Sequence, residues 1–228
     1  MQPYFGSRKT SIILAADLPT LDDNLSLIDR VADHVDVIKI ASPLVYREGA
    51  RAIRAVAERS HKPVLADLKV ADVPHTDARI VDLVRRFGGA AVMVHGFVGP
   101  DALEDCMEAA RDQIGIIVQL ELTNPGGAMF TQPIAEDMAR LAREIGVYGV
   151  QAPGNRPDRI RAIRGVVGPE MTVVCCGVGA QGGTYGTVLA SGGTYAIIGR
   201  SIYEAADPVR AIYQILASST PGDTHDIA

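Results

Sequence analysis

The stretch Val64-Leu65-Ala66-Asp67-Leu68-Lys69 is an apolar, strand-like run that carries charged residues at its C-terminal end. Strands of a parallel sheet that is covered on both faces are apolar almost throughout, so a charge within one of them needs an explanation. Two earlier apolar runs show the same feature, because Asp17 ends the first and Lys39 lies near the end of the second. This repeated placement predicts a polar site where several parallel strands finish.

Apolar runs of this kind alternate with longer amphipathic segments from Ser11 to about Ala217, which is typical of repeated βα units. The length of 228 residues is close to the roughly 250 of a (β/α)8 barrel, and near-equal repeats favour a closed barrel over an open sheet. We therefore predict an α/β fold, a single (β/α)8 TIM barrel over residues 1–217, with a flexible C-terminal tail at 218–228. The predicted strands are Ile12–Asp17, Val35–Ile40, Val64–Lys69, Ala90–His95, Ile116–Leu122, Val147–Ala152, Thr172–Gly177 and Tyr195–Gly199.

Local signals predict where several helices begin and end. Thr20 with Asp23 resembles a capping box, and Pro100 suits the first turn of a helix. Gly88 and Gly115 are typical of residues that follow a helix, and both are expected to end one.

Composition narrows the classes of partner. The net charge is −5, and the basic residues are scattered instead of forming a stripe, so we expect no nucleic-acid partner. The segment Met1–Thr10 is polar, and no apolar run approaches the roughly 20 residues that cross a bilayer, so we expect no membrane association and a cytoplasmic location. Cys106, Cys175 and Cys176 lack metal-ligand spacing and are predicted to be buried, reduced and structural.

The charged end of the third strand has a definite expected geometry. Side chains alternate faces along a strand, so Asp67 and Lys69 share one face and are predicted to point inward. Asp72 follows just beyond the strand and completes the pattern Asp-x-Lys-x-x-Asp, which would place a lysine between two carboxylates at the mouth of the barrel. Barrels of this class carry out their chemistry at that end.

Two interpretations of this cluster remain open. A structural ion-pair network at the barrel rim is the simpler one. Lysine usage favours a functional site instead, because Lys39 and Lys69 both occupy apolar strands in a chain that has few lysines. Flanking carboxylates raise the pKa of an ammonium, so Lys69 suits a cation or proton donor better than a Schiff-base nucleophile.

A second group of residues predicts phosphate binding. The glycine-rich segment 177–183 follows the seventh strand, and Gly199-Arg200-Ser201 follows the eighth. Loops after these two strands are the usual phosphate site of the fold, and Arg200 adds a permanently charged fork. The spacing is not that of a dinucleotide-binding turn, so no such cofactor is expected. His95 ends the fourth strand and is interpreted as a hydrogen-bonded structural histidine, with a functional role left open.

These segments resemble the orotidine 5′-phosphate decarboxylase family, in its short form found in archaea. The resemblance runs from about Ile12 to Leu216 and rests on the segments 66–74, 94–97, 177–183 and 198–201. It implies decarboxylation of orotidine 5′-phosphate to uridine 5′-phosphate in de novo pyrimidine biosynthesis, with no metal or cofactor. It also implies a homodimer in which Asp72 and Thr76 reach the neighbouring subunit's site.

The resemblance assigns roles to individual residues. Lys69 would be the proton donor, with Asp67, Asp72 and Lys39 completing a catalytic charged array. The implied substrate-binding residues are Asp17 and Lys39 for ribose hydroxyls, Thr123 for the pyrimidine edge, Gln181 between base and phosphate, Gly199 and Arg200 for the phosphate, and Thr76 and Pro125 elsewhere in the substrate site. The family often has serine where Thr123 stands and isoleucine where Val73 stands, and neither change alters the chemistry.

Two other functions compete with this one. A magnesium-dependent sugar-phosphate decarboxylase or aldolase of the same barrel group shares Asp-x-Lys-x-x-Asp, but such enzymes carry a metal-binding glutamate where Lys39 stands here. Lysine repels a divalent cation. A catalytically silent phosphate-binding barrel is the other alternative, and it has no use for an inward Lys69 flanked by carboxylates.

Overall fold

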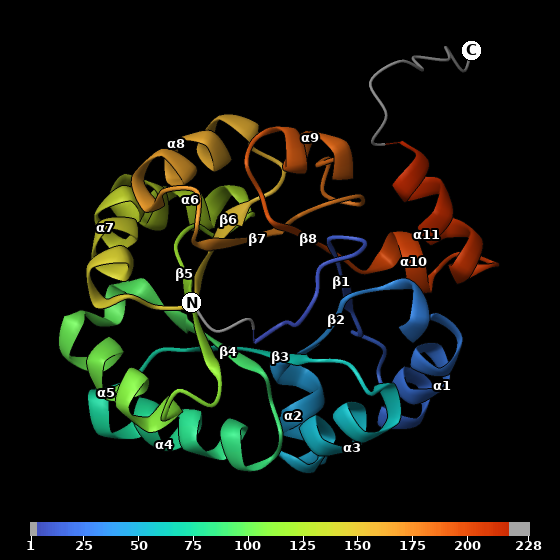
Figure 1. The fold of residues 1–228 in the computed structure, drawn as a ribbon, viewed down its shortest axis with the longest axis horizontal. Helices are drawn as coiled ribbons and strands as arrows, with labels where there is room; N and C mark the ends of the chain where they lie inside the picture. Colours follow the sequence, from blue (N-terminus) through green and yellow to red (C-terminus); the bar gives the residue numbers. More distant parts are fainter. Residues whose placement is uncertain (1–3, 219–228) are drawn as a thin grey trace.

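The computed structural model describes residues 4–218, so residues 219–228 of the predicted tail lie outside the described residues. Eight parallel strands close into a barrel in sequence order, and helices surround it (Figure 1). The predicted (β/α)8 architecture is confirmed. The strands are β1 Ile12–Ala15, β2 Val37–Ala41, β3 Val64–Val70, β4 Ala91–His95, β5 Gly115–Gln119, β6 Gly149–Pro153, β7 Thr172–Cys176 and β8 Tyr195–Ile198.

The helices follow the strands, and several short ones are added in the loops at the C-terminal ends of strands. The longer helices are α1 Leu21–Val31, α3 Arg51–Ser60, α4 Pro74–Arg86, α5 Pro100–Ala110, α7 Ala135–Ile145, α8 Pro157–Val167 and α11 Pro208–Ala217. The shorter ones are α2 Ser42–Glu48, α6 Pro125–Thr131, α9 Tyr185–Ala190 and α10 Arg200–Tyr203, with 3-10 turns η1 Ala32–His34, η2 Gly96–Val98 and η3 Gln132–Ile134. Within residues 4–218, no helix is both long and apolar enough to cross a membrane.

Helix signals were correct at most of the predicted boundaries. Thr20 caps α1 by accepting a hydrogen bond from the Asp23 N–H at 3.1 Å, and Pro100 begins α5. Gly115 was assigned wrongly, because it begins β5 instead of ending a helix. Glycine is required at this position because a Cβ atom would lie 2.6 Å from Cδ1 of Tyr148, which is too close.

Strand side chains divide the interior into two cores, as the period of two requires. Ile12, Leu14, Ile38 and Ile40 point outward and pack against the helices. The residues of the inner core fill the barrel instead. They include Ile13, Val37, Leu65, Met93, Ile117, Val174 and Ile197.

The N-terminal segment closes one end of the barrel. Figure 1 shows the first described residues, in dark blue, running across the opening inside the ring of strands. Phe5 is buried against the rings of Tyr148 and Tyr195, at centroid separations of 5.2 and 5.6 Å. The Asp36 carboxylate then accepts hydrogen bonds from the backbone N–H groups of residues 9–11, which fixes the segment in place. Because this end is packed, a site with solvent access has to lie at the opposite, C-terminal end.

Candidate active site

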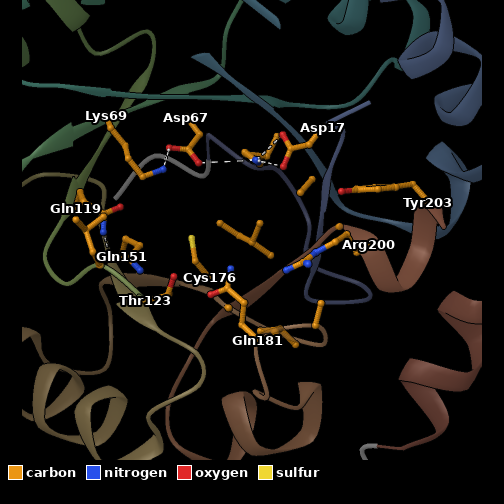
Figure 2. Close-up of a pocket in the computed structure, with 18 residues that line it drawn as sticks. Asp17, Asp67, Lys69, Gln119, Thr123, Gln151, Cys176, Gln181, Arg200 and Tyr203 are labelled. Atoms are coloured by element: carbon orange, nitrogen blue, oxygen red, sulfur yellow. Dashed lines mark hydrogen bonds and ion pairs between the residues drawn. The ribbon is translucent and has the colours of Figure 1, made fainter. Parts of the chain in front are cut away.

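The cavity at the C-terminal ends of the strands has a volume of about 220 Å³. Figure 2 shows its charged and amide side chains converging from opposite walls. Residues from most of the strands contribute, as expected for a site at this end of a barrel. Of the residues predicted from sequence, the cavity is lined by Asp17, Lys39, Asp67, Lys69, Thr123, Gln181, Gly199 and Arg200.

Four charged residues form one alternating chain along the cavity wall. Lys39 Nζ lies 2.8 Å from both carboxylate oxygens of Asp17 and 3.8 Å from Oδ2 of Asp67. Lys69 Nζ lies 2.7 Å from Oδ1 of Asp67. Asp67 therefore bridges two ammonium groups, which keeps this nearly buried carboxylate paired with charges of opposite sign.

An irregularity of β3 shapes the end of the strand that carries Asp67 and Lys69. Ala66 pairs with Val92, but Val70 pairs with Val94, so β3 bulges away from the regular ladder between these pairs. Lys69 has a φ of 47°, in the left-handed region that non-glycine residues rarely adopt. Such a conformation costs about 1–3 kcal/mol and persists only where the surrounding contacts hold it. The expected inward position of both side chains is confirmed, although the strand is not regular here.

The Lys69 ammonium is held in its charged form. Burial alone lowers its pKa, but the nearby Asp67 carboxylate, together with Cys176 and Asp17, raises the pKa above the usual value. About a third of the Lys69 side chain remains exposed to the cavity (36%). The group is thus a fixed cation with access to whatever occupies the cavity.

Asp72, Thr76 and Pro125 do not line the cavity of this chain. Lys69 was expected to lie between two carboxylates, but only that of Asp67 lies beside it. Asp72 lies beyond the strand end and is exposed. The Asp72 N–H donates to Oδ1 of Asp77 at 2.9 Å, which anchors the loop while its side chain stays outside. Pro125 begins α6, where its fixed φ suits the first helical turn.

Neither Asp72 nor Thr76 caps the helix α4 with its side chain. The helix α4 begins at Pro74, its N-cap residue is Val73, and no side chain caps it. Asp72 Oδ1 accepts the Val73 N–H at 2.7 Å, one residue before the helix.

The glycine-rich segment and the start of α10 form the opposite wall. Gly179 N–H donates to the Gly183 carbonyl at 2.7 Å, and Gly183 N–H donates to the Gly177 carbonyl at 3.2 Å, so the segment is a compact turn. A Cβ atom on Gly183 would lie 2.5 Å from the Gly154 carbonyl oxygen, which leaves glycine as the residue that fits. Figure 2 shows Gln181 and Arg200 extending from this wall into the cavity. The arrangement offers a permanent positive charge and an amide to an anion.

Thr123 is held by a network behind the loop that follows β5. The carbonyl oxygens of Leu122 and Thr123 accept hydrogen bonds from Arg156 and Asn155 respectively. Glu121 is fully buried and pairs with Arg156 at 3.2 Å and with Arg159 at 2.9 Å. The loop that presents Thr123 is therefore tied to the start of α8.

Sequence reasoning missed seven residues of the cavity wall, which are Ala15, Gln119, Leu122, Gln151, Cys176, Ile197 and Tyr203. Charged residues within apolar strands gave the signal for this site, so neutral Gln119 and Gln151 went unnoticed, although an amide in a buried strand is the same kind of signal. Cys176 was predicted to be buried and structural, yet it lines the cavity, and burial raises its pKa to about 11. Leu122 and Tyr203 gave no signal, because an apolar loop residue and a helical tyrosine are common.

His95 ends β4 next to the charged chain. It is buried, and its ring lies 4.5 Å from that of Phe97. Its Nδ1 has no hydrogen-bond partner among residues 4–218, which departs from the expected hydrogen-bonded structural histidine. Burial, together with the Lys69 ammonium, lowers the pKa of His95 to about 4. The imidazole is therefore neutral at physiological pH.

This lowered pKa predicts a pH-dependent stability. Below about pH 6.5 the unfolded chain binds a proton at His95 while the folded chain does not, so stability decreases as the pH falls towards about 4. The contribution amounts to up to about 3 kcal/mol. We expect a His95→Gln variant to show a flatter dependence of the free energy of unfolding on pH in this window, measured by urea denaturation. Equal slopes in both proteins would contradict a buried neutral His95.

The carboxylates of the cavity are already paired with ammonium groups. Asp17 and Asp67 are the acidic residues of the wall, and Lys39 contacts both of them. Among the described residues 4–218, no group of three or more His, Cys, Asp or Glu side chains has the arrangement of a metal site. The donor set of the wall thus suits an anionic organic ligand better than a divalent cation.

Comparison with known proteins gives a consistent result. The family model described as Orotidine 5′-phosphate decarboxylase / HUMPS family matches residues 10–215. A curated orotidine 5′-phosphate decarboxylase of Methanosarcina acetivorans is 43% identical over 209 residues, covering 91% of this chain and 94% of the relative. One from Pyrococcus furiosus is 36% identical over 204 residues, covering 90% of this chain and 95% of the relative.

Solved structures agree. The crystal structure of orotidine 5′-monophosphate decarboxylase from Methanocaldococcus jannaschii complexed with inhibitor BMP has a TM-score of 0.85 and 33% identity, covering 90% of this chain and 96% of that chain. The enzyme from Pyrococcus horikoshii has a TM-score of 0.83 and 34% identity, with coverages of 91% and 98%.

Proposed function

Because the chain belongs to the orotidine 5′-phosphate decarboxylase / HUMPS family, we propose that it converts orotidine 5′-phosphate to uridine 5′-phosphate and carbon dioxide in pyrimidine biosynthesis. The observation that carries this proposal is the position of the Lys69 ammonium. It projects into the same cavity as Arg200 and Gln181, but from the opposite wall (Figure 2). A nucleotide that placed its phosphate at Arg200 would extend its base towards Lys69.

Lys69 has the properties that the reaction needs. Breaking the bond between C6 and the carboxylate leaves an electron pair in an sp² orbital at C6, which the pyrimidine ring does not delocalise. A fixed cation stabilises this charge, and at about 4 Å and an effective dielectric of about 20 one such pair interacts by roughly 4 kcal/mol. The ammonium then gives a proton to C6, which completes uridine 5′-phosphate and leaves a neutral amine that solvent reprotonates.

The remaining residues are assigned to substrate binding. The binding contacts contribute the larger share of the rate enhancement. We assign the ribose hydroxyls to Asp17 and Lys39, and the pyrimidine edge to Thr123. The phosphate is assigned to Gly199 and Arg200, and Gln181 is assigned to a bridge between base and phosphate. One cation supplies too little energy for a very slow reaction, so binding at the phosphate and ribose must position C6 against Lys69. The Asp67 carboxylate contributes by holding Lys69 at 2.7 Å.

The proposed working unit is a homodimer with composite sites. Asp72 and Thr76 do not line the cavity of their own chain, and Asp72 is exposed at its rim. In a two-fold dimer each subunit would lend this rim to its partner, and both sites would form at one isologous interface. We therefore assign Asp72 to the charged array, and Thr76 to the binding residues, of the neighbouring subunit.

An apolar surface supports this assembly. Large apolar side chains are exposed in the segments that follow three consecutive strands, β3, β4 and β5. Because these segments are neighbours at the rim that carries Asp72, they suit contact with a second copy of the chain. The side chains are Val73, Phe97, Met129 and Phe130.

We propose that the reaction requires no metal, in contrast to the magnesium-dependent sugar-phosphate enzymes of the same barrel group. Lys39 stands where those enzymes are expected to carry a metal ligand, and its ammonium contacts both carboxylates of the wall. We expect activity with orotidine 5′-phosphate to survive exhaustive treatment with EDTA and to stay unchanged when magnesium is added. Activity restored by magnesium alone would favour the sugar-phosphate function.

Product analysis tests the proposed function against this alternative. EDTA-treated protein is incubated with orotidine 5′-phosphate, and magnesium-loaded protein with 3-keto-L-gulonate 6-phosphate, and products are identified by mass spectrometry. We expect uridine 5′-phosphate in the first reaction and unchanged substrate in the second. The reverse pattern would overturn the proposal, and no product in either reaction would favour a phosphate-binding protein without catalysis.

A further inference from the structure

Gln119 and Gln151 form a buried amide pair in the cavity wall that none of the assigned roles uses. They are register partners on β5 and β6, with exposed fractions of 1% and 0%. The Gln119 Nε2 donates to Oε1 of Gln151 at 2.6 Å. Both residues line the cavity, so the pair is part of the surface that a substrate meets.

The backbone fixes the orientation of Gln151. Its Oε1 accepts a hydrogen bond from the Glu121 N–H at 3.3 Å, and its Nε2 donates to the Ala152 carbonyl at 2.9 Å. Rotating the amide by 180° would bring N–H against N–H and oxygen against oxygen. Gln151 therefore always presents its oxygen to Gln119.

Gln151 in turn fixes the orientation of Gln119. The Nε2 group of Gln119 donates to Gln151 and also to the Glu121 carbonyl at 3.2 Å, so both of its N–H groups are used. Its Oε1 is buried and has no hydrogen-bond partner among residues 4–218. The outcome is a buried oxygen, in a residue that lines the cavity, that can only accept a hydrogen bond. A buried acceptor left unpaired is unfavourable, so a donor in the cavity is expected to use it.

Lys69 is the donor best placed to do so. Figure 2 shows the Lys69 and Gln119 side chains on the same side of the cavity, with Gln181 and Arg200 on the other. Lys39 is engaged with Asp17 and Asp67, whereas Lys69 Nζ donates, among residues 4–218, to Asp67 alone. An ammonium has three N–H groups, so Lys69 retains donors for a second acceptor.

We propose that the Gln119–Gln151 pair positions the Lys69 ammonium, with Gln119 Oε1 accepting one of its N–H groups when a nucleotide fills the cavity. Asp67 and Gln119 then hold two N–H groups, and the third is directed at the substrate. Gln119 is a positioning residue in this scheme, because it acts on the reaction through Lys69. The inference rests on the proposed function for the identity of the substrate.

Loss of this acceptor has a defined electrostatic sign. Groups near Lys69 come from several strands: Asp67 on its own strand, Asp17, Lys39, His95 and Cys176. A neutral acceptor added to this set favours the ammonium over the amine. Replacing Gln119 with an apolar residue is therefore expected to lower the pKa of Lys69 and to move the basic limb of the pH–kcat profile to lower pH.

Lysine NMR tests the proposal independently of turnover. The chain has four lysines, at positions 9, 39, 62 and 69, so ¹³Cε labelling gives few resonances, and a Lys69→Ala sample assigns the one of interest. Titrations are recorded for the wild type, Gln119→Leu, Gln119→Met and Gln151→Leu, each saturated with uridine 5′-phosphate. The control is Gln214→Leu, which makes the same change on the exposed face of α11.

We expect the pKa of Lys69 to fall by about half a unit or more in both Gln119 variants and by less in Gln151→Leu. In parallel, kcat should fall about tenfold or more with a nearly unchanged KM, whereas Gln214→Leu should match the wild type. Gln119 variants with the wild-type Lys69 pKa and kcat would overturn the proposal, as would variants that lose only thermal stability. An inactive wild type would contradict the proposed function, while the titration would still test the contact.

Discussion

Replacing Lys69 with alanine is expected to lower turnover by about 10⁴-fold or more, because one change removes both the cation beside C6 and the proton donor. Nucleotide binding should change little, since the phosphate and ribose contacts lie elsewhere in the cavity. The charge acts mainly in the transition state, so kcat falls and affinity for uridine 5′-phosphate persists. The measurements are steady-state kinetics with orotidine 5′-phosphate and calorimetric titration with uridine 5′-phosphate.

Three further variants isolate the role of the ammonium. Lys69 has a φ of 47°, and asparagine tolerates this region better than alanine, so Lys69→Asn guards against a folding defect. Lys69→Arg keeps a positive charge but cannot deliver a proton, so it should also be inactive. Lys62→Ala makes the same substitution at a lysine outside the cavity and should leave turnover intact. A Lys69→Ala enzyme that folds and retains substantial activity would contradict the assigned mechanism.

Mixing two inactive variants is expected to restore activity. If Asp72 completes the neighbouring subunit's site, Lys69→Ala and Asp72→Ala are each inactive alone. Random exchange of equal amounts makes half of the dimers mixed, and each mixed dimer has one intact site, so about one quarter of the wild-type activity should return. The activity is measured after subunit exchange, which native mass spectrometry of differently labelled subunits verifies.

The control for this experiment is a mixture that cannot regenerate a site. Lys69 and Asp67 of one site come from the same subunit. In a mixture of Lys69→Ala and Asp67→Ala subunits, every subunit therefore lacks one of the two residues, and no dimer contains an intact site. No recovery in the Lys69→Ala and Asp72→Ala mixture, despite proven exchange, would show that Asp72 does not act across an interface.

Charges at strand ends made much of the fold predictable, because the strands of a barrel covered by helices do not otherwise tolerate charged residues. Asp17, Lys39 and Asp67 were recognised as charges at the ends of apolar runs, and they meet in one chain of ion pairs. The period of two also placed Lys69 correctly. It could not show the bulge of β3, because register depends on pairing with β4 and not on the sequence of one strand.

The misplaced residues show where local patterns stop being informative. Asp72 follows Lys69 closely in sequence, but the strand ends between them, so its side chain leaves the cavity. Gly115 resembled a helix end. Its lack of a side chain instead allows close packing against Tyr148, which precedes a different strand, β6. Gln119 and Gln151 were overlooked because a neutral amide is unremarkable until its neighbours across the sheet are known.

The ultraviolet absorbance of orotidine 5′-phosphate, followed after addition of purified, EDTA-treated protein, tests the central claim most directly. We predict a steady decrease to the spectrum of uridine 5′-phosphate at a rate proportional to protein concentration, and no decrease with the Lys69→Ala variant. An absorbance that stays constant with folded wild-type protein, at concentrations that bind uridine 5′-phosphate, would contradict the account.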